Sequence, residues 1–108
     1  MTTFDERERG FETKFARDQE MQFKITARRN RLLGRWAAER LGLSEVEAET
    51  YAGDVIRADF EEAGDDDVVR KLLGDLTAAG VEVDEQEIRT QIEEKTVEAR
   101  RQLMESQG

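Results

Sequence analysis

The chain lacks three residue types entirely: its 108 residues include no cysteine, no histidine and no proline. The absence of cysteine excludes disulfides, thiol nucleophiles and thiolate metal sites. The absence of histidine removes the usual metal ligand and general base, together with the side chain that normally changes charge near neutral pH. Without proline, no helix has to end because a backbone N–H is missing.

Long apolar segments are also lacking. No stretch approaches the length of a membrane span, and no apolar signal-peptide segment follows the charged first ten residues. We therefore expect a soluble, cytoplasmic protein without direct membrane insertion. The length corresponds to one domain with one modest core.

Charge is plentiful but unevenly distributed. The net charge is −9, from 17 basic and 26 acidic residues. Residues 1–35 contain nine Lys/Arg and six Asp/Glu, or +3, whereas residues 36–108 contain eight and twenty, or −12. The sequence therefore predicts a basic N-terminal stretch, residues 1–35, attached to an acidic body.

The composition favours helices, and no segment shows the alternation of a strand. We predict an all-α fold, a four-helix bundle-like domain with a long first helix and a flexible N-terminal arm. The first helix begins near Thr3 and could run to Leu41, with interruptions at Gly10 and Gly34. The arm is assigned to residues 1–18 and the helical domain to residues 19–108, with helices at about 19–41, 44–63, 66–79 and 84–106.

Helix boundaries and core faces follow from short patterns. Ser44 with Glu47 forms a capping box, and Gly42 and Gly80 are candidates for helix C-termini. Apolar residues at helical spacing predict the buried faces. They are Met21, Ile25, Leu32, Leu33, Trp36, Val68, Val69, Leu72, Leu73, Leu76, Ile88, Ile92, Ala99 and Leu103, together with some of Val46, Tyr51, Ala52, Val55, Ile56 and Phe60.

The N-terminal arm has an aromatic stripe. Phe4, Phe11 and Phe15 are spaced i, i+7 and i+11, so they share one face of a helix, but charged residues surround them. Such a narrow stripe cannot offset the entropy of ordering, so we expect residues 1 to about 18 to be frayed or disordered alone. The pattern suits an arm that binds in a partner's groove; the alternative is that the aromatics fold back on the domain or stay exposed.

Catalytic and metal sites are not predicted. An EF-hand template laid on Asp59 to Arg70 fails, because Ala63 and Arg70 occupy positions that need oxygen ligands. The Asp65-Asp66-Asp67 run is expected instead to cap the third helix. No phosphate-binding loop or nucleophile elbow is present, and carboxylate pairs such as Glu93-Glu94 lie in highly charged faces. We therefore expect no enzyme, no cofactor and no metal.

Two further features have conventional interpretations. The basic run Arg28-Arg29-Asn30-Arg31, with Arg35, could contact nucleic acid, but the acidic body argues against that. These arginines are expected to pair with acidic faces of the second and fourth helices or with an acidic partner. Trp36 follows Leu32 and Leu33 at helical spacing, which predicts a core position.

The sequence also resembles a known family. Residues 4–16 read FDERERGFETKFA, residues 28–34 read RRNRLLG, and residues 36–39 read WAAE. These strings are similar to those of subunit zeta, the inhibitor of the alphaproteobacterial F-type ATP synthase. The resemblance covers nearly the whole chain; the first string is specific, and the C-terminal helices match mainly by pattern.

The resemblance implies a four-helix fold with a mobile N-terminus. It implies that this terminus becomes helical in a catalytic α/β interface of the synthase head and blocks rotation of the central stalk, by analogy with the mitochondrial inhibitor protein. The implied partners are the alpha, beta and gamma subunits of that head. The inhibitory, partner-binding residues are then Phe4, Arg7, Arg9, Phe11, Lys14, Phe15 and Arg17.

Two other functions stay open at this point. One is a helical adaptor whose arm binds a different partner. The other is a weak nucleotide- or metal-sensing module without catalysis, in which carboxylates and helix N-termini hold the ligand.

Overall fold

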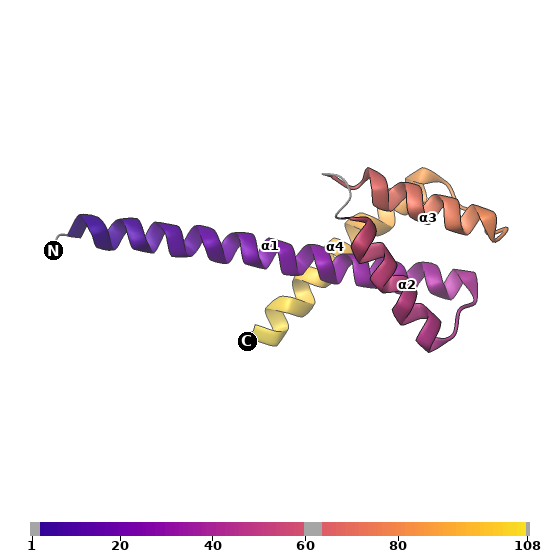
Figure 1. The fold of residues 1–108 in the computed structure, drawn as a ribbon, viewed down its shortest axis with the longest axis horizontal. Coiled ribbons are helices and arrows are strands. Elements are labelled where there is room, and N and C mark those ends of the chain that lie inside the picture. Colours follow the sequence, from indigo (N-terminus) through magenta and orange to yellow (C-terminus); the bar gives the residue numbers. More distant parts are fainter. Residues whose placement is uncertain (1–2, 60–63, 108) are drawn as a thin grey trace.

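The computed structural model consists of four helices: α1 (Thr3–Leu41), α2 (Glu45–Ala58), α3 (Asp66–Ala78) and α4 (Glu85–Gln107). It describes the backbone of residues 3–59 and 64–107, and the side chains of residues 18–59 and 64–106. No strand occurs in these ranges, so the predicted all-α, four-helix class is confirmed. The chain is elongated, with extents of 65 × 28 × 21 Å, and α1 lies along the long axis (Figure 1).

Helix α1 is continuous through both of its glycines, so the interruptions expected at Gly10 and Gly34 do not occur. Its 39 residues span about 58 Å at 1.5 Å per residue. The helix ends at Gly42, whose positive φ of 74° is accessible to glycine at no steric cost. The Gly42 N–H donates to the Glu39 carbonyl at 3.2 Å and the Leu43 N–H to the Ala38 carbonyl at 3.0 Å. These two bonds form the predicted C-terminal motif.

Helix α2 begins as predicted and ends earlier than predicted. The Glu47 N–H donates to the Ser44 hydroxyl at 3.2 Å, and the Ser44 N–H donates to the Glu47 carboxylate at 3.0 Å. The capping box is therefore confirmed. The helix ends at Ala58, with Asp59 as its C-cap, so the predicted end at about Ala63 is wrong. Residues 60–63, including the core candidate Phe60, lie outside the described residues.

Helices α3 and α4 differ in how they start. Asp65 occupies the N-cap of α3 but its side chain makes no capping hydrogen bond, which corrects the capping role expected for it. Before α4, the Asp84 carboxylate accepts a 2.8 Å hydrogen bond from the Glu87 N–H, as expected of a cap. Between the two helices, the Val81 N–H bonds to the Leu76 carbonyl at 3.0 Å and closes α3.

The main core lies where all four helices meet. Its members are the apolar faces of the C-terminal half of α1, of α2, of α3 and of the first half of α4. The buried residues are Leu33, Ala37, Val55, Val68, Val69, Leu72, Leu76, Ile88 and Ile92. Most of the predicted core positions are thus confirmed, but Val46 is 78% exposed.

A second, smaller cluster joins α1 to the C-terminal half of α4. Ile25, Ala99 and Leu103 are buried in it, with Met21 and Leu32 at its edge. In Figure 1, α4 runs back across α1, so that its last turns lie on the other side of α1 from α3. Among the described residues, no helix is both long and apolar enough to span a bilayer.

Candidate partner-binding site

The N-terminal part of α1 projects away from the other three helices. Figure 1 shows its backbone as a helix that continues from the core to the N-terminus with no other element beside it. The seven site residues predicted from the sequence all belong to this part, and their side chains lie outside the described residues. They are Phe4, Arg7, Arg9, Phe11, Lys14, Phe15 and Arg17.

The base of this projecting helix is fixed by the second apolar cluster. Met21 is the first residue of α1 that packs in a described core cluster, and Ile25, one turn later, is only 5% exposed. Both lie against α4, where Ala99 and Leu103 are buried. Helix α4 therefore holds α1 at the point where the helix leaves the domain.

Helices α1 and α2 approach each other closely at Gly34. A methyl group on Gly34 would lie 2.5 Å from the Cα of Ala52, well inside van der Waals contact. Only a residue without a side chain fits there, and Ala52 opposite is 1% exposed. Gly34 and Ala38 are one turn apart on α1, as are Ala48 and Ala52 on α2, so small residues at i, i+4 were a sequence signal for this contact.

Arg29 forms a buried ion cluster that sequence reasoning missed. Its guanidinium lies 3.0 Å from Asp65 and 3.6 Å from Asp59, and its own side chain is 9% exposed. The same group donates to the Asn30 side-chain oxygen at 2.9 Å. Arg29 thus ties α1 to both ends of the connection between α2 and α3. Asp65, expected to cap α3, serves here as the partner of Arg29.

The neighbouring arginines pair at the surface. Arg31 lies 3.1 Å from the Glu49 carboxylate, and Arg35 lies 3.0 Å from Glu45 and also pairs with Glu49. Arg28 instead donates to Gln102 on α4 at 3.2 Å. The expected pairing with an acidic face of α2 is confirmed, while the described contact with α4 is to an amide.

A polar contact joins α2 and α3. The Tyr51 hydroxyl donates to the Asp75 carboxylate at 2.7 Å, and the Lys71 ammonium lies 3.0 Å from the same oxygen. Lys71 also lies 5.0 Å from the centre of the Tyr51 ring. Burial, and then the hydrogen bond to Asp75, raise the pKa of Tyr51 far above its ordinary value. Burial opposes ionisation of Asp75, but the bonds from Tyr51 and Lys71 outweigh it and lower the pKa of Asp75.

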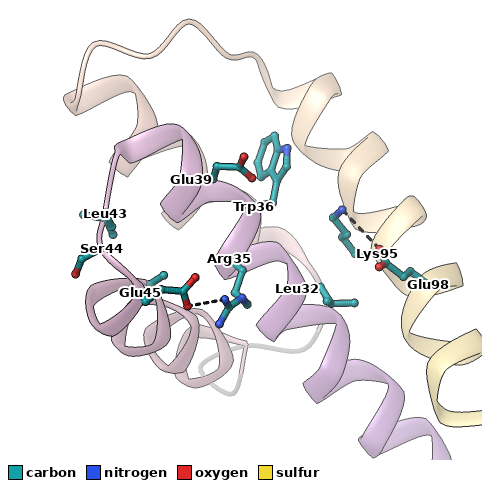
Figure 2. Close-up of a pocket in the computed structure, with 10 residues that line it drawn as sticks. Leu32, Arg35, Trp36, Glu39, Leu43, Ser44, Glu45, Lys95 and Glu98 are labelled. Atoms are coloured by element: carbon teal, nitrogen blue, oxygen red, sulfur yellow. Dashed lines mark hydrogen bonds and ion pairs between the residues drawn. The ribbon is translucent and has the colours of Figure 1, made fainter. Parts of the chain in front are cut away.

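A groove of about 480 Å³ opens between α1, the start of α2 and α4. Figure 2 shows Trp36 and Leu32 on its floor, with Arg35 and Lys95 on opposite sides. Arg35 pairs with Glu45, and Lys95 lies 3.7 Å from Glu98, so both cations are already neutralised within the domain. Trp36 is partly buried against the core rather than fully enclosed, and Arg40 stacks over its ring at 4.9 Å.

The carboxylates do not gather into a metal site in the part of the chain that the structure describes. No three acidic side chains converge there in the way that a metal ion requires. The three aspartates that open α3 point to different arginines: Asp65 to Arg29, Asp66 to Arg89 and Asp67 to Arg70. The first two pairs join the start of α3 to α1 and α4, and the third lies within α3.

The fold defines a class: all-helical proteins of four helices whose first helix extends well beyond the domain. A family model described as ATPase inhibitor subunit zeta matches residues 1–102. The chain belongs to this family. A solved structure, described as the solution NMR structure of a protein, is 51% identical, covers 80% of this chain and 98% of its own, and superposes with a TM-score of 0.71. No curated protein matches the chain.

Proposed function

We propose that the chain inhibits ATP hydrolysis by an F-type ATP synthase through residues 1–18. This segment would enter a catalytic interface between an alpha and a beta subunit, on the cytoplasmic head of the enzyme, and block rotation of the gamma subunit. The described helices α2 to α4, with the C-terminal half of α1, form the domain that carries the segment. The family membership supports the inhibitory role, and the rest of the proposal concerns how it is exerted.

The observation that carries this proposal is the projection of α1 beyond its own domain. The described apolar clusters begin at Met21, and the preceding backbone extends away from α2, α3 and α4. Phe4, Phe11 and Phe15 share one face of that helix, which is the pattern of a helix that binds in a groove. Arg7, Arg9, Lys14 and Arg17 alternate there with acidic residues and offer charge complementarity to a partner.

The domain supplies rigidity rather than contact in this scheme. The Gly34–Ala52 approach fixes α1 against α2, Arg29 ties it to the end of α2 and the start of α3, and the cluster around Ile25 fixes it against α4. The segment is therefore presented as the extension of a helix that is already formed. Pre-forming part of the bound helix lowers the entropy cost of ordering the remainder.

Deletion of residues 2–18 tests the proposal. We expect the shortened protein to lose inhibition of ATP hydrolysis by the synthase head purified from the same source, while circular dichroism shows that α2 to α4 remain folded. The described core contains no residue before Met21, so the domain should tolerate the deletion. A shortened protein that still inhibits fully would show that the inhibitory element lies elsewhere.

A further inference from the structure

The outward face of α4 carries exposed apolar and charged residues, and no hydrogen bond or ion pair joins them to another helix within the described residues. These residues recur at helical spacing, and all of them are exposed. We name this set the α4 outer stripe; it consists of Glu93, Glu94, Val97, Arg100, Arg101 and Met104. Val97 and Met104 are 64% and 66% exposed, which is high for apolar side chains inside a helix.

The charges of the α4 outer stripe are arranged symmetrically about Val97. Two glutamates precede it by four and three residues, and two arginines follow it by three and four residues. If a second α4 lies antiparallel with the two-fold axis at Val97, each residue meets the one at the same distance on the other side. Arg100 then meets Glu94 of the second copy, and Arg101 meets Glu93.

The intramolecular contacts leave these charges available. Glu93 and Arg100 form no ion pair within the described residues, and Arg101 makes only an exposed pair with Glu105 at 3.2 Å. Glu94 accepts one exposed hydrogen bond from the Gln91 amide, also at 3.2 Å. The stripe itself is neutral, although each chain carries a net charge of −9. The ion pairs can thus form across the two-fold axis. The remaining negative charge of the two chains opposes association, so the dimer should be weak and reversible.

We propose that the α4 outer stripe is a self-association surface, on which a second copy of this chain binds antiparallel about Val97. An isologous contact of this kind closes on itself, so it produces a dimer rather than a filament. Charge complementarity favours a second copy as the occupant, because the charges of the stripe complement themselves only when the second helix is reversed. The inference does not depend on the proposed inhibitory mechanism.

Cysteine cross-linking tests the geometry cleanly, because the natural chain contains no cysteine. Val97→Cys places two thiols at the two-fold axis, within the roughly 7 Å between Cα atoms that a disulfide needs. Met104→Cys places them about 21 Å apart, from seven residues on either side of the axis at 1.5 Å each. Val46→Cys, at the exposed start of α2, reports random collision.

We expect oxidation with diamide to give a disulfide dimer from Val97→Cys roughly tenfold faster than from either control, because association raises the effective concentration of the thiols. Equal rates for all three variants, or a faster rate for Met104→Cys, would overturn the antiparallel pairing.

Charge reversal gives a second, independent readout. In the Val97→Cys background, E93R/E94R makes the stripe wholly basic and R100E/R101E makes it wholly acidic, so each variant alone should lose the fast cross-link. Mixing the two variants should restore it as a heterodimer. Circular dichroism checks that each variant remains helical. Loss of cross-linking without restoration on mixing would contradict the proposed charge pairing.

Discussion

Gly34 of α1 faces Ala52 of α2 so closely that a methyl group on the glycine would lie 2.5 Å from the Ala52 Cα. The contact is to backbone, so relief requires the two helices to separate. It lies next to Leu33 and Val55, both fully buried in the main core. A small change at this position therefore propagates into the packing of the whole domain.

The first prediction concerns this contact. Gly34→Ala should lower the free energy of unfolding by about 1–3 kcal/mol, because overpacking outweighs the gain in helix propensity. Gly74→Ala in α3 is the matched control, since nothing lies within 4 Å of the added methyl group. The control should stabilise by about 0.5–1 kcal/mol. Thermal and urea unfolding measure both, and equal effects of the two substitutions would refute the close approach.

The second prediction concerns the only tyrosine of the chain. Since the folded state raises the pKa of Tyr51, its ionisation favours unfolding: stability is intact below about pH 10, the pKa of unfolded tyrosine, and falls as pH rises above it. Ultraviolet absorbance should therefore show tyrosinate appearing together with the loss of helical circular dichroism. Tyrosinate that forms in the folded protein near pH 10 would contradict this.

Asp75, the partner of Tyr51, gives stability the opposite dependence on pH. The folded state lowers the pKa of Asp75, so its contribution is present above the ordinary pKa of an aspartate and is lost as pH falls through that range. Tyr51→Phe removes the hydrogen bond and should cost about 0.5–1.5 kcal/mol near neutral pH. It should also weaken the acid dependence, which unfolding titrations of the variant and the natural chain can compare.

The third prediction concerns the buried arginine. Arg29→Met leaves Asp59 and Asp65 without their partner and should lower stability by about 2–4 kcal/mol. Lysine should not restore it fully, because one ammonium cannot match the guanidinium fork. Arg31→Met is the control: Arg31 is 56% exposed beside Glu49, so we expect less than about 1 kcal/mol. Similar losses for both variants would show that Arg29 has no special role.

The fourth prediction concerns the aromatic face of the projecting segment. Phe4, Phe11 and Phe15 are each replaced with alanine in a separate variant. Each substitution should raise the concentration needed for half inhibition of ATP hydrolysis by at least about tenfold. Thr13→Ala changes the opposite side of the helix and should have little effect. Potency that responds equally to Thr13 and to the aromatics would argue against a groove that holds this face.

Features governed by neighbouring residues could be predicted from the sequence. The Ser44–Glu47 capping box and the glycine endings at Gly42 and Gly80 depend on a few consecutive residues, and the structure contains all three. Most of the main core was also predicted, because apolar residues at helical spacing form a single face of the helix, and that face packs against the core. The early end of α2 at Ala58 was missed, since the preceding pattern continues past it.

Features that depend on distant residues could not be predicted. Arg29 looks like one more member of a basic run, and only the fold brings Asp59 and Asp65 to it. For the same reason Asp65 was assigned to a cap, which is its local option. The Tyr51–Asp75 contact joins two helices through side chains 24 positions apart, a relationship with no local signature. The residues of the candidate site itself were proposed from the N-terminal pattern and the family resemblance.

Helix α1 is unbroken from its first turns into the core. The rotation of the projecting segment about the helix axis is therefore fixed relative to the rest of the domain. One extra residue before Met21 would turn Phe4, Phe11 and Phe15 by about 100° around the helix axis, with no change in the residues themselves. An insertion close to a whole number of turns would lengthen the projecting helix and leave the direction of its aromatic face nearly unchanged. The packing of α1 in the domain core thus determines the direction in which the aromatic side chains face, although the core residues are far from them.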